Sequence, residues 1–314
     1  MDSIIWVERT RVRDLGIKIT PNILEALLLS VIAGRHLSVV TNNVQATEES
    51  IESLFVDGWG FAKGDEFVIV TLNFKSIFDP TTIFGLPELA SGNTMKLEPR
   101  ILILEGLENT SKKFQRDLDD YINDVARLSN NDNIFTLIIL GKTTLNSSID
   151  EVLLDDIWIE QTHECRIELH EVESDNLTDR NLQSAQFIDL VIKARKNSQR
   201  VVLVREIKTY IYDIVIFVRT NRFVVGGLPT FVLGEFKHFV AIYAVLHGYE
   251  YVVPEMVRQA AYSLLPIRIH MLKDPQKEPS IQYGSDPALV SQILDKVDIP
   301  IIIDEVMGKI QPPI

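Results

Sequence analysis

Cysteine is nearly absent from this chain of 314 residues, in which Cys165 is the single thiol. One cysteine can form neither an internal disulfide nor a zinc site built from several cysteines. Long apolar runs are missing too, and a run such as residues 23–33 falls far short of the roughly 20 residues that a membrane span needs. The chain starts without the basic segment and apolar core of a secretion signal. We therefore expect an intracellular protein of the cytoplasm, the nucleus or both, with no membrane segment.

Known catalytic signatures are missing as well. The sequence contains no G-x-S-x-G, H-E-x-x-H or G-x-G-x-x-G motif, and its six histidines are scattered along the chain. Gly141-Lys142-Thr143 has the form of the end of a phosphate-binding motif. Thr136 stands where that motif requires its first glycine, so we interpret the segment as a plain loop. No residue is predicted to be catalytic, and we expect no cofactor.

Two groups of polar side chains could carry chemistry, but each has a simpler interpretation. His163, Cys165 and His170 are metal-ligand types, yet along an extended strand His170 points away from the other two, so a half-buried strand is favoured over a metal site. Asp119-Asp120 and Asp155-Asp156 are paired carboxylates. Adjacent residues of a helix do not face each other, so both pairs are predicted to lie on solvated faces rather than to share a proton.

Negative charge dominates the chain, with 31 Lys and Arg against 44 Asp and Glu and a formal net charge of −13. Such a surface repels phosphate polymers, which argues against direct nucleic-acid binding. Residues 193–208 depart from this balance with six cations and one acid. Charge runs are often only solvated faces, but this segment is our candidate for binding a partner, through Lys193, Arg195, Lys196 and Arg200.

Apolar segments in the first half of the chain alternate between two periods. Residues 23–33 and 114–128 have helical spacing, whereas four short β-branched runs fit buried strands, at residues 37–40, 67–70, 101–104 and 136–140. Strands that alternate with helices predict an α/β fold with a parallel sheet.

The second half of the chain has a different character. Residues 176–200 are predicted to be a linker or surface insertion, and helical spacing recurs after it within residues 201–275. The proline-containing tail, residues 276–314, is expected to pack back onto the fold, because Ile301-Ile302-Ile303 is too apolar to remain in water.

The helix at residues 25–33, followed by Gly34-Arg35-His36-Leu37-Ser38-Val39-Val40, resembles the segment before the phosphate-binding loop of the MoxR and magnesium-chelatase AAA+ ATPases. Gly227-Leu228-Pro229 and the helices through residues 248–257 resemble the helical lid of the same enzymes. The resemblance covers most of the chain. It implies an AAA+-like α/β core with a parallel sheet over residues 1–175 and a C-terminal helical lid over residues 201–275.

The phosphate-binding positions of that family are occupied by other residue types in this chain. Thr41 and Val44 stand in the glycine-rich loop, where β-branched residues resist the backbone conformations that glycine permits. Thr47 stands at the lysine position and Glu48 at the magnesium-binding hydroxyl. A carboxylate about 4 Å from a phosphate charge costs roughly 1 kcal/mol in water and about 4 kcal/mol at an effective dielectric constant of 20.

Three further positions depart from the family pattern. Glu105 and Gly106 match the Asp-Glu pair that follows the strand at 101–104, and a glycine cannot orient an attacking water. Asp156 aligns with the arginine that reaches a neighbouring subunit, and Thr230 aligns with the lid arginine. The resemblance therefore implies a degenerate nucleotide site and no ATPase activity.

Residues 210–222, the block Tyr283-Gly284-Ser285-Asp286-Pro287 and the Pro312-Pro313 ending resemble the fungal family of maintenance of telomere capping protein 2. This resemblance implies a role in telomere capping. We predict a non-enzymatic interaction or scaffold protein that acts through protein partners, as a monomer or as a subunit of a hetero-complex. A weak residual AAA+-type ATPase that uses Glu105 is the alternative, and direct nucleic-acid binding through residues 193–208 is a third reading.

Overall fold

The computed structural model describes residues 3–64, 66–73, 75–77, 100–128, 134–145, 149–164 and 180–313. They form two compact units. The N-terminal unit comprises residues 1–197 and 246–248, and the C-terminal unit comprises residues 198–245 and 249–314. Among the described residues, no helix is both long enough and apolar enough to cross a membrane.

A five-stranded parallel sheet in the order β2-β3-β4-β1-β5 runs through the N-terminal unit. Its strands are β1 (His36–Thr41), β2 (Phe67–Thr71), β3 (Ile101–Glu105), β4 (Thr136–Gly141) and β5 (Ile157–His163). The central strands are buried on both faces, which explains their unbroken apolar runs. The four strands expected from the sequence and the parallel α/β class are confirmed.

Strand β5 was only partly anticipated. The half-buried strand expected around His163 ends at that residue, and the sheet pairing instead involves the apolar residues before it, from Ile157 onward. Cys165 and His170 lie outside the described residues.

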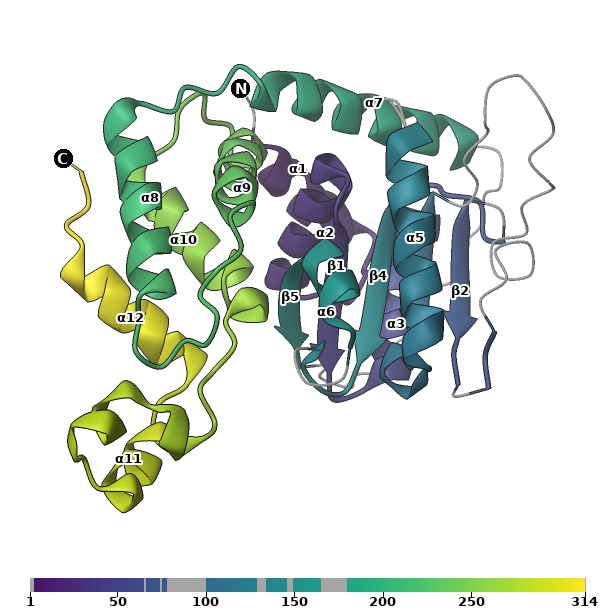
Figure 1. Ribbon diagram of the computed structural model, residues 1–314. Helices are drawn as coiled ribbons and strands as arrows, with labels where there is room; N and C mark the ends of the chain where they lie inside the picture. The colour runs from purple at the N-terminus through teal and green to yellow at the C-terminus, as the bar shows by residue number, and fades with distance from the viewer. Residues whose placement is uncertain are drawn as a thin grey trace. The chain divides into compact units, whose positions relative to one another are not determined.

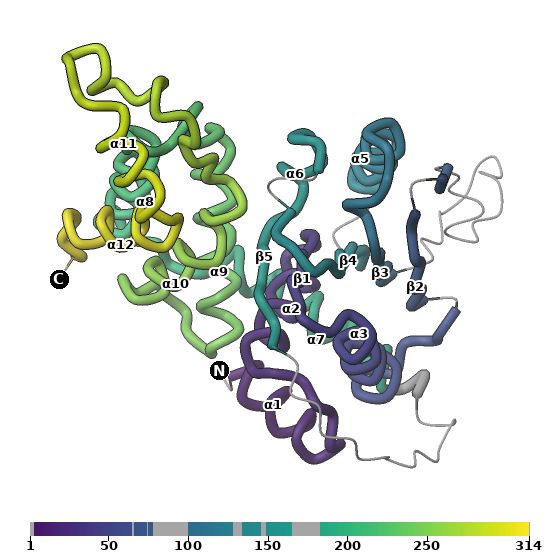
Figure 2. The backbone as a smooth tube through the Cα atoms, turned by 90° about the horizontal axis from the view of Figure 1, so that it is seen from below, coloured from purple at the N-terminus to yellow at the C-terminus, as the bar shows by residue number. Residues whose placement is uncertain are grey.

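Helices cover both faces of this sheet (Figures 1 and 2). Helices α5 (Lys112–Leu128) and α6 (Glu151–Asp156) lie on one face and pack against each other. Helices α1 (Ile4–Asp14), α2 (Pro21–Ala33) and α3 (Val44–Ser53) lie on the other face. Proline opens α2 and Gly34 closes it with a φ of 63°, as the sequence predicts.

The linker predicted over residues 176–200 is wrong for its described part, because Arg180–Ser198 forms helix α7. Phe187, Val191 and Ala194 recur at helical spacing and are buried. The Phe187 ring stacks on Trp59, with 4.2 Å between the ring centroids. Helix α7 is therefore part of the core of the N-terminal unit rather than a surface insertion.

A buried histidine joins two strands of the sheet. His36 opens β1, and its Nδ1 accepts a hydrogen bond from the backbone N–H of Leu137 in β4 at 3.1 Å. An accepting ring nitrogen carries no proton. Burial, with a smaller contribution from the charge of Arg35, lowers the pKa of His36 to about 3. His36 is a neutral structural residue of the core.

The C-terminal unit is helical, as expected. Its longer helices are α8 (Arg205–Arg219), α9 (Val232–Leu246), α10 (Pro254–Leu264), α11 (Pro287–Leu294) and α12 (Ile299–Lys309). Helix α12 belongs to the tail and packs against α8 and α10. Asp298 caps α12 by accepting a hydrogen bond from the N–H of Ile301 at 2.9 Å, and Ile302 and Ile303 are buried.

Candidate functional site

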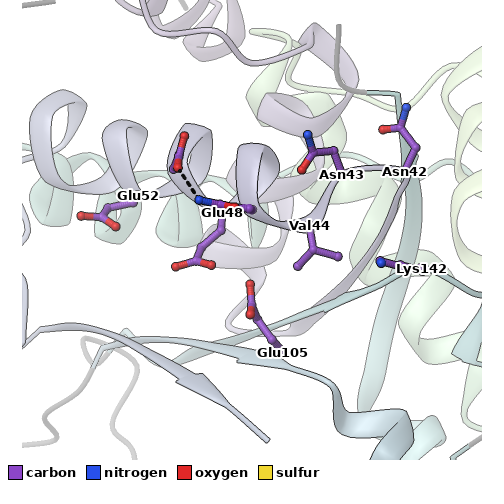
Figure 3. A pocket seen from close by; sticks show the side chains of 9 residues that line it. Asn42, Asn43, Val44, Glu48, Glu52, Glu105 and Lys142 are labelled. Carbon is purple, nitrogen blue, oxygen red and sulfur yellow. Dashed lines mark hydrogen bonds between the residues drawn. The ribbon is translucent and has the colours of Figure 1, made fainter. Parts of the chain in front are cut away.

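A pocket of about 730 Å³ opens at the carboxyl edge of the sheet in the N-terminal unit (Figure 3). The ends of β1, β3 and β4 and the start of α3 surround it. This edge is the usual ligand position of open α/β sheets. The lining residues are Asn42, Asn43, Val44, Gln45, Glu48, Glu49, Glu52, Glu105 and Lys142.

The turn between β1 and α3 is held by its own side chains. Asn43 Oδ1 accepts a hydrogen bond from the N–H of Ala46 at 3.2 Å, which is an ordinary helix N-cap. Thr47 Oγ1 donates to the carbonyl oxygen of Asn43 at 2.8 Å and lies 2.7 Å from Thr41 Oγ1. Thr41 and Thr47 are 2% and 1% exposed. The residue at the predicted lysine position therefore lies beneath the turn and does not line the pocket.

Glu48 and Glu105 bring two carboxyl groups together inside the pocket. Figure 3 shows them pointing toward each other from α3 and from the end of β3. The pKa of Glu48 is raised to about 7, mainly by burial and then by a hydrogen bond to Glu105 and by the charges of Glu105, Glu52 and Glu49. Two carboxylates can hydrogen-bond only when one of them is protonated.

The two carboxyl oxygens of Glu105 differ in their hydrogen-bond donors. Glu105 Oε2 accepts a hydrogen bond from Thr71 Oγ1 at 3.3 Å, whereas Oε1 is buried and no donor among the described residues is hydrogen-bonded to it. A protonated Glu48 supplies a donor for Oε1. Near neutral pH Glu48 can therefore hold a proton and donate it in a hydrogen bond to Glu105.

Gly106 follows Glu105 in a left-handed conformation, with a φ of 73°. A Cβ at this position would lie 2.8 Å from the carbonyl oxygen of Leu72. Real Cβ atoms do not approach backbone oxygen so closely, so the local backbone excludes any side chain here. Residue 106 cannot contribute a water-orienting carboxylate without a rearrangement of the turn.

Lys142 directly follows β4 and lines the pocket, although the sequence favours a plain loop for Gly141-Lys142-Thr143. It is the cation in a lining that holds four glutamates. The pocket is therefore strongly acidic when all five groups are charged. Sequence reasoning identified Glu48 and Glu105 but missed Glu49 and Glu52, for which the Glu48-Glu49 pair and the one-turn spacing to Glu52 were the available signals.

Asp156 lies away from this pocket. Helix α6 ends at Asp156, where β5 begins, so this residue lies at the opposite edge of the parallel sheet. The pKa of Asp156 is raised to about 7, mainly by burial and then by a hydrogen bond and the charge of Asp119, against a smaller lowering effect of Arg35. Asp119 is 7% exposed.

The solvated face predicted for these aspartates is therefore wrong for the Asp119–Asp156 pair. Neighbours in sequence do not face each other here, as expected, but Asp119 of α5 meets Asp156 of α6. The packing of two helices brings together carboxyl groups that are 37 positions apart in the chain. No local pattern in the sequence signals such a pair.

The predicted partner-binding cations have separate roles. Lys193 forms an ion pair with Asp189 at 2.5 Å within α7. Arg195 instead donates from Nε to the carbonyl oxygen of Ile32 at 2.8 Å and from Nη2 to that of Val31 at 2.9 Å. The guanidinium thus satisfies carbonyl groups in the last turn of α2, and Arg195 is a structural residue rather than an open contact.

The other predicted site residues, Lys196, Arg200 and Thr230, do not line the pocket. Lys196 is exposed on α7 in the N-terminal unit, whereas Arg200 is exposed in the C-terminal unit. Thr230 is an exposed residue of the C-terminal unit, in the turn before α9. Within the described parts of the chain, no group of three or more His, Cys, Asp and Glu residues could hold a metal ion.

Comparison with known proteins identifies distant relatives. No protein-family model matches the chain. Maintenance of telomere capping protein 2 from Lachancea thermotolerans is 32% identical over 117 residues, which cover 36% of this chain and 41% of the relative. The same protein from Candida glabrata is 30% identical over 106 residues, which cover 32% of this chain and 25% of the relative. The matches therefore span less than half the length of these relatives.

A solved structure resembles nearly the whole fold. A protein from Cytophaga hutchinsonii, described as a candidate ATPase, aligns with a TM-score of 0.60 over 94% of this chain and 96% of its own. The two sequences are 13% identical, so this similarity concerns the fold alone. The aligned 94% of the chain includes parts of both the sheet and the C-terminal helices.

Proposed function

We propose that this chain, a distant homologue of maintenance of telomere capping protein 2 with an AAA-like fold, is a non-enzymatic interaction protein that supports chromosome-end maintenance. The chemistry of the pocket at the carboxyl edge of the sheet carries the non-enzymatic part of this proposal. Four glutamates and one lysine line the space that corresponds to a nucleotide site in the AAA+ resemblance.

Charge in this pocket opposes a triphosphate. Each carboxylate about 4 Å from a phosphate charge costs roughly 1 kcal/mol in water and about 4 kcal/mol at an effective dielectric constant of 20. The lysine that would reach the β- and γ-phosphates is replaced by Thr47, whose hydroxyl is used within the turn. Lys142 offsets only one of the four acidic groups.

Local backbone geometry supports the same proposal independently of charge. The start of α3 is capped by Asn43, so the N–H of Ala46 is already used. Gly106 has no room for a side chain that could orient water toward a γ-phosphate. The site therefore lacks three of the usual groups for phosphoryl transfer: the lysine, the magnesium-binding hydroxyl and the catalytic carboxylate.

Calorimetry and a turnover assay test the absence of ATPase activity. The full chain is titrated with ATP and excess Mg²⁺, and phosphate release is followed under the same conditions. We expect neither saturable binding at millimolar ATP nor turnover above the buffer rate. The double variant Glu48→Gln/Glu105→Gln separates charge from shape, with Glu151→Gln, an exposed glutamate on α6, as the matched control. Turnover by the unmodified chain would overturn the proposal.

The interaction role predicts a definite assembly behaviour. AAA+ rings are held together in part by nucleotide shared between subunits, and Asp156 here lies at the other edge of the sheet and pairs with Asp119. We expect a monomer, or a subunit of a hetero-complex, whose mass in light scattering does not change when ATP is added. An ATP-dependent six-membered ring would contradict this expectation.

A weak residual ATPase is the second candidate function. Lys142, Asn42 and Asn43 line the pocket beside the first turn of α3, where a phosphate could meet one ammonium group and the helix N-terminus. This alternative predicts slow ATP turnover that Glu105→Ala abolishes and Lys142→Ala weakens. Zero turnover under magnesium excess removes it.

A further inference from the structure

The contact between Glu48 and Glu105 joins two elements that are otherwise separated by the pocket. Glu48 lies in the second turn of α3, and Glu105 is the last residue of β3. Each side chain projects from its own element toward the other (Figure 3). Thr71 of β2 donates a hydrogen bond to Glu105 Oε2, whereas Glu105 Oε1 is buried and has no donor within the described ranges of the chain.

The charged groups around this contact come from several elements. Glu49 and Glu52 of α3 and Lys142 after β4 line the same pocket, and Glu108 in the turn after β3 has a buried Oε2. The other lining residues are neutral. Acidic groups therefore outnumber the lysine, and their field favours a proton on the carboxyl pair.

We propose that this carboxyl pair is a proton-operated latch: one proton held between Glu48 and Glu105 ties α3 to the end of β3, and loss of that proton releases the first turns of α3. The released part is the turn that Asn43 caps and that covers Thr41 and Thr47. Its release changes the shape and the charge of the pocket mouth together. The latch does not depend on whether the pocket binds a nucleotide.

The latch operates in the neutral range, because the pKa of Glu48 is raised from 4.5 to about 7. A carboxyl group with a raised pKa stabilises the closed form below its ordinary pKa and loses that effect as the pH rises through the raised value. For these two values, linkage predicts that the opening equilibrium of α3 rises by up to about tenfold between pH 6 and pH 8. Solvent near the partly exposed Glu48 makes this an upper limit.

Hydrogen exchange of the full chain tests the latch. Exchange of the α3 amides, Val44–Ser53, is measured by mass spectrometry between pH 6 and pH 8 and corrected for intrinsic rates. The buried β4 amides, Thr136–Gly141, serve as the internal reference. We expect the relative protection of α3 to fall at least threefold over this range. Unchanged relative protection overturns the proposal.

Two variants distinguish the proton from general loosening of the fold. Glu48→Gln keeps a permanent N–H donor toward Glu105, so its α3 protection should be independent of pH. Glu151→Gln should follow the unmodified chain. A carbon-13 NMR titration of the Glu48 carboxyl group should show a midpoint near 7. A midpoint near 4.5, or the same pH dependence in Glu48→Gln, also overturns the proposal.

Discussion

Truncation of Arg195 tests whether α7 is an integral part of the N-terminal unit or a mobile carrier of binding charges. The guanidinium makes two hydrogen bonds to the α2 carbonyl groups of Ile32 and Val31, at 2.8 and 2.9 Å. A hydrogen bond to a charged group contributes about 1.5–3 kcal/mol, and a cation at a helix C-terminus adds about 0.3–1 kcal/mol. Because water can replace part of each bond, we expect Arg195→Ala to lower the free energy of unfolding by about 2–3 kcal/mol.

Urea unfolding followed by tryptophan fluorescence measures this loss. Trp6, Trp59 and Trp158 all belong to the N-terminal unit, so the signal reports that unit. The matched control is Lys196→Ala, one residue further along α7 and exposed, which should change stability by no more than about 0.5 kcal/mol. Arg195→Lys should recover only part of the loss, because an ammonium group does not present the same fixed pair of donors.

Equal effects of Arg195→Ala and Lys196→Ala would refute this reasoning. The Arg195 guanidinium would then contribute no more to stability than the exposed Lys196 side chain. A loss confined to Arg195→Ala would leave Lys193 and Lys196 as the predicted contacts of α7 that are neither buried nor used to cap a helix.

Two further changes have clear expectations. Gly106→Ala should lower the free energy of unfolding by about 2–4 kcal/mol, because the new Cβ would lie 2.8 Å from the carbonyl oxygen of Leu72. The control Gly64→Ala, which has open space around the new Cβ, should cost about 1 kcal/mol. Equal shifts of the two variants in thermal unfolding would contradict the steric argument. The pKa of Asp156 is raised from 3.8 to about 7, so its stabilising effect is complete below pH 3.8 and is lost as the pH rises through 7. Asp119→Asn should therefore flatten the decline in stability between pH 4 and pH 7, while Asp120→Asn, on an exposed face of α5, should leave the decline unchanged.

Segments with strong local patterns could be predicted from the sequence. Continuous apolar runs indicated β1 to β4, and the 3.6-residue period indicated α2, α5, α8, α9 and α10 but not α11 and α12 of the tail. A central parallel strand is buried on both faces, so successive residues must all be apolar, and this makes the strand recognisable in the sequence. The parallel α/β class followed from the order of these segments.

Helix α7 shows where local pattern was insufficient. Its residues Phe187, Val191 and Ala194 have helical spacing, but charged residues surround them and the preceding segment is polar. The stacking of Phe187 on Trp59 buries this narrow apolar stripe. That stacking depends on a residue more than 100 positions earlier, which no local window includes.

By itself, the sequence determined the residue types that stand at the edge of the sheet: glutamates at Glu48 and Glu105, a glycine at Gly106 and no phosphate-binding lysine at Thr47. Only the tertiary structure decided how these groups act, because protonation, burial and capping depend on neighbours brought together by folding. The fold buries Thr47, places Glu48 beside Glu105 and directs the hydrogen bonds of Arg195 to the last turn of α2. Each of these contacts joins separate elements of the chain, and the energy of such a contact depends on distance in space rather than on position in the sequence.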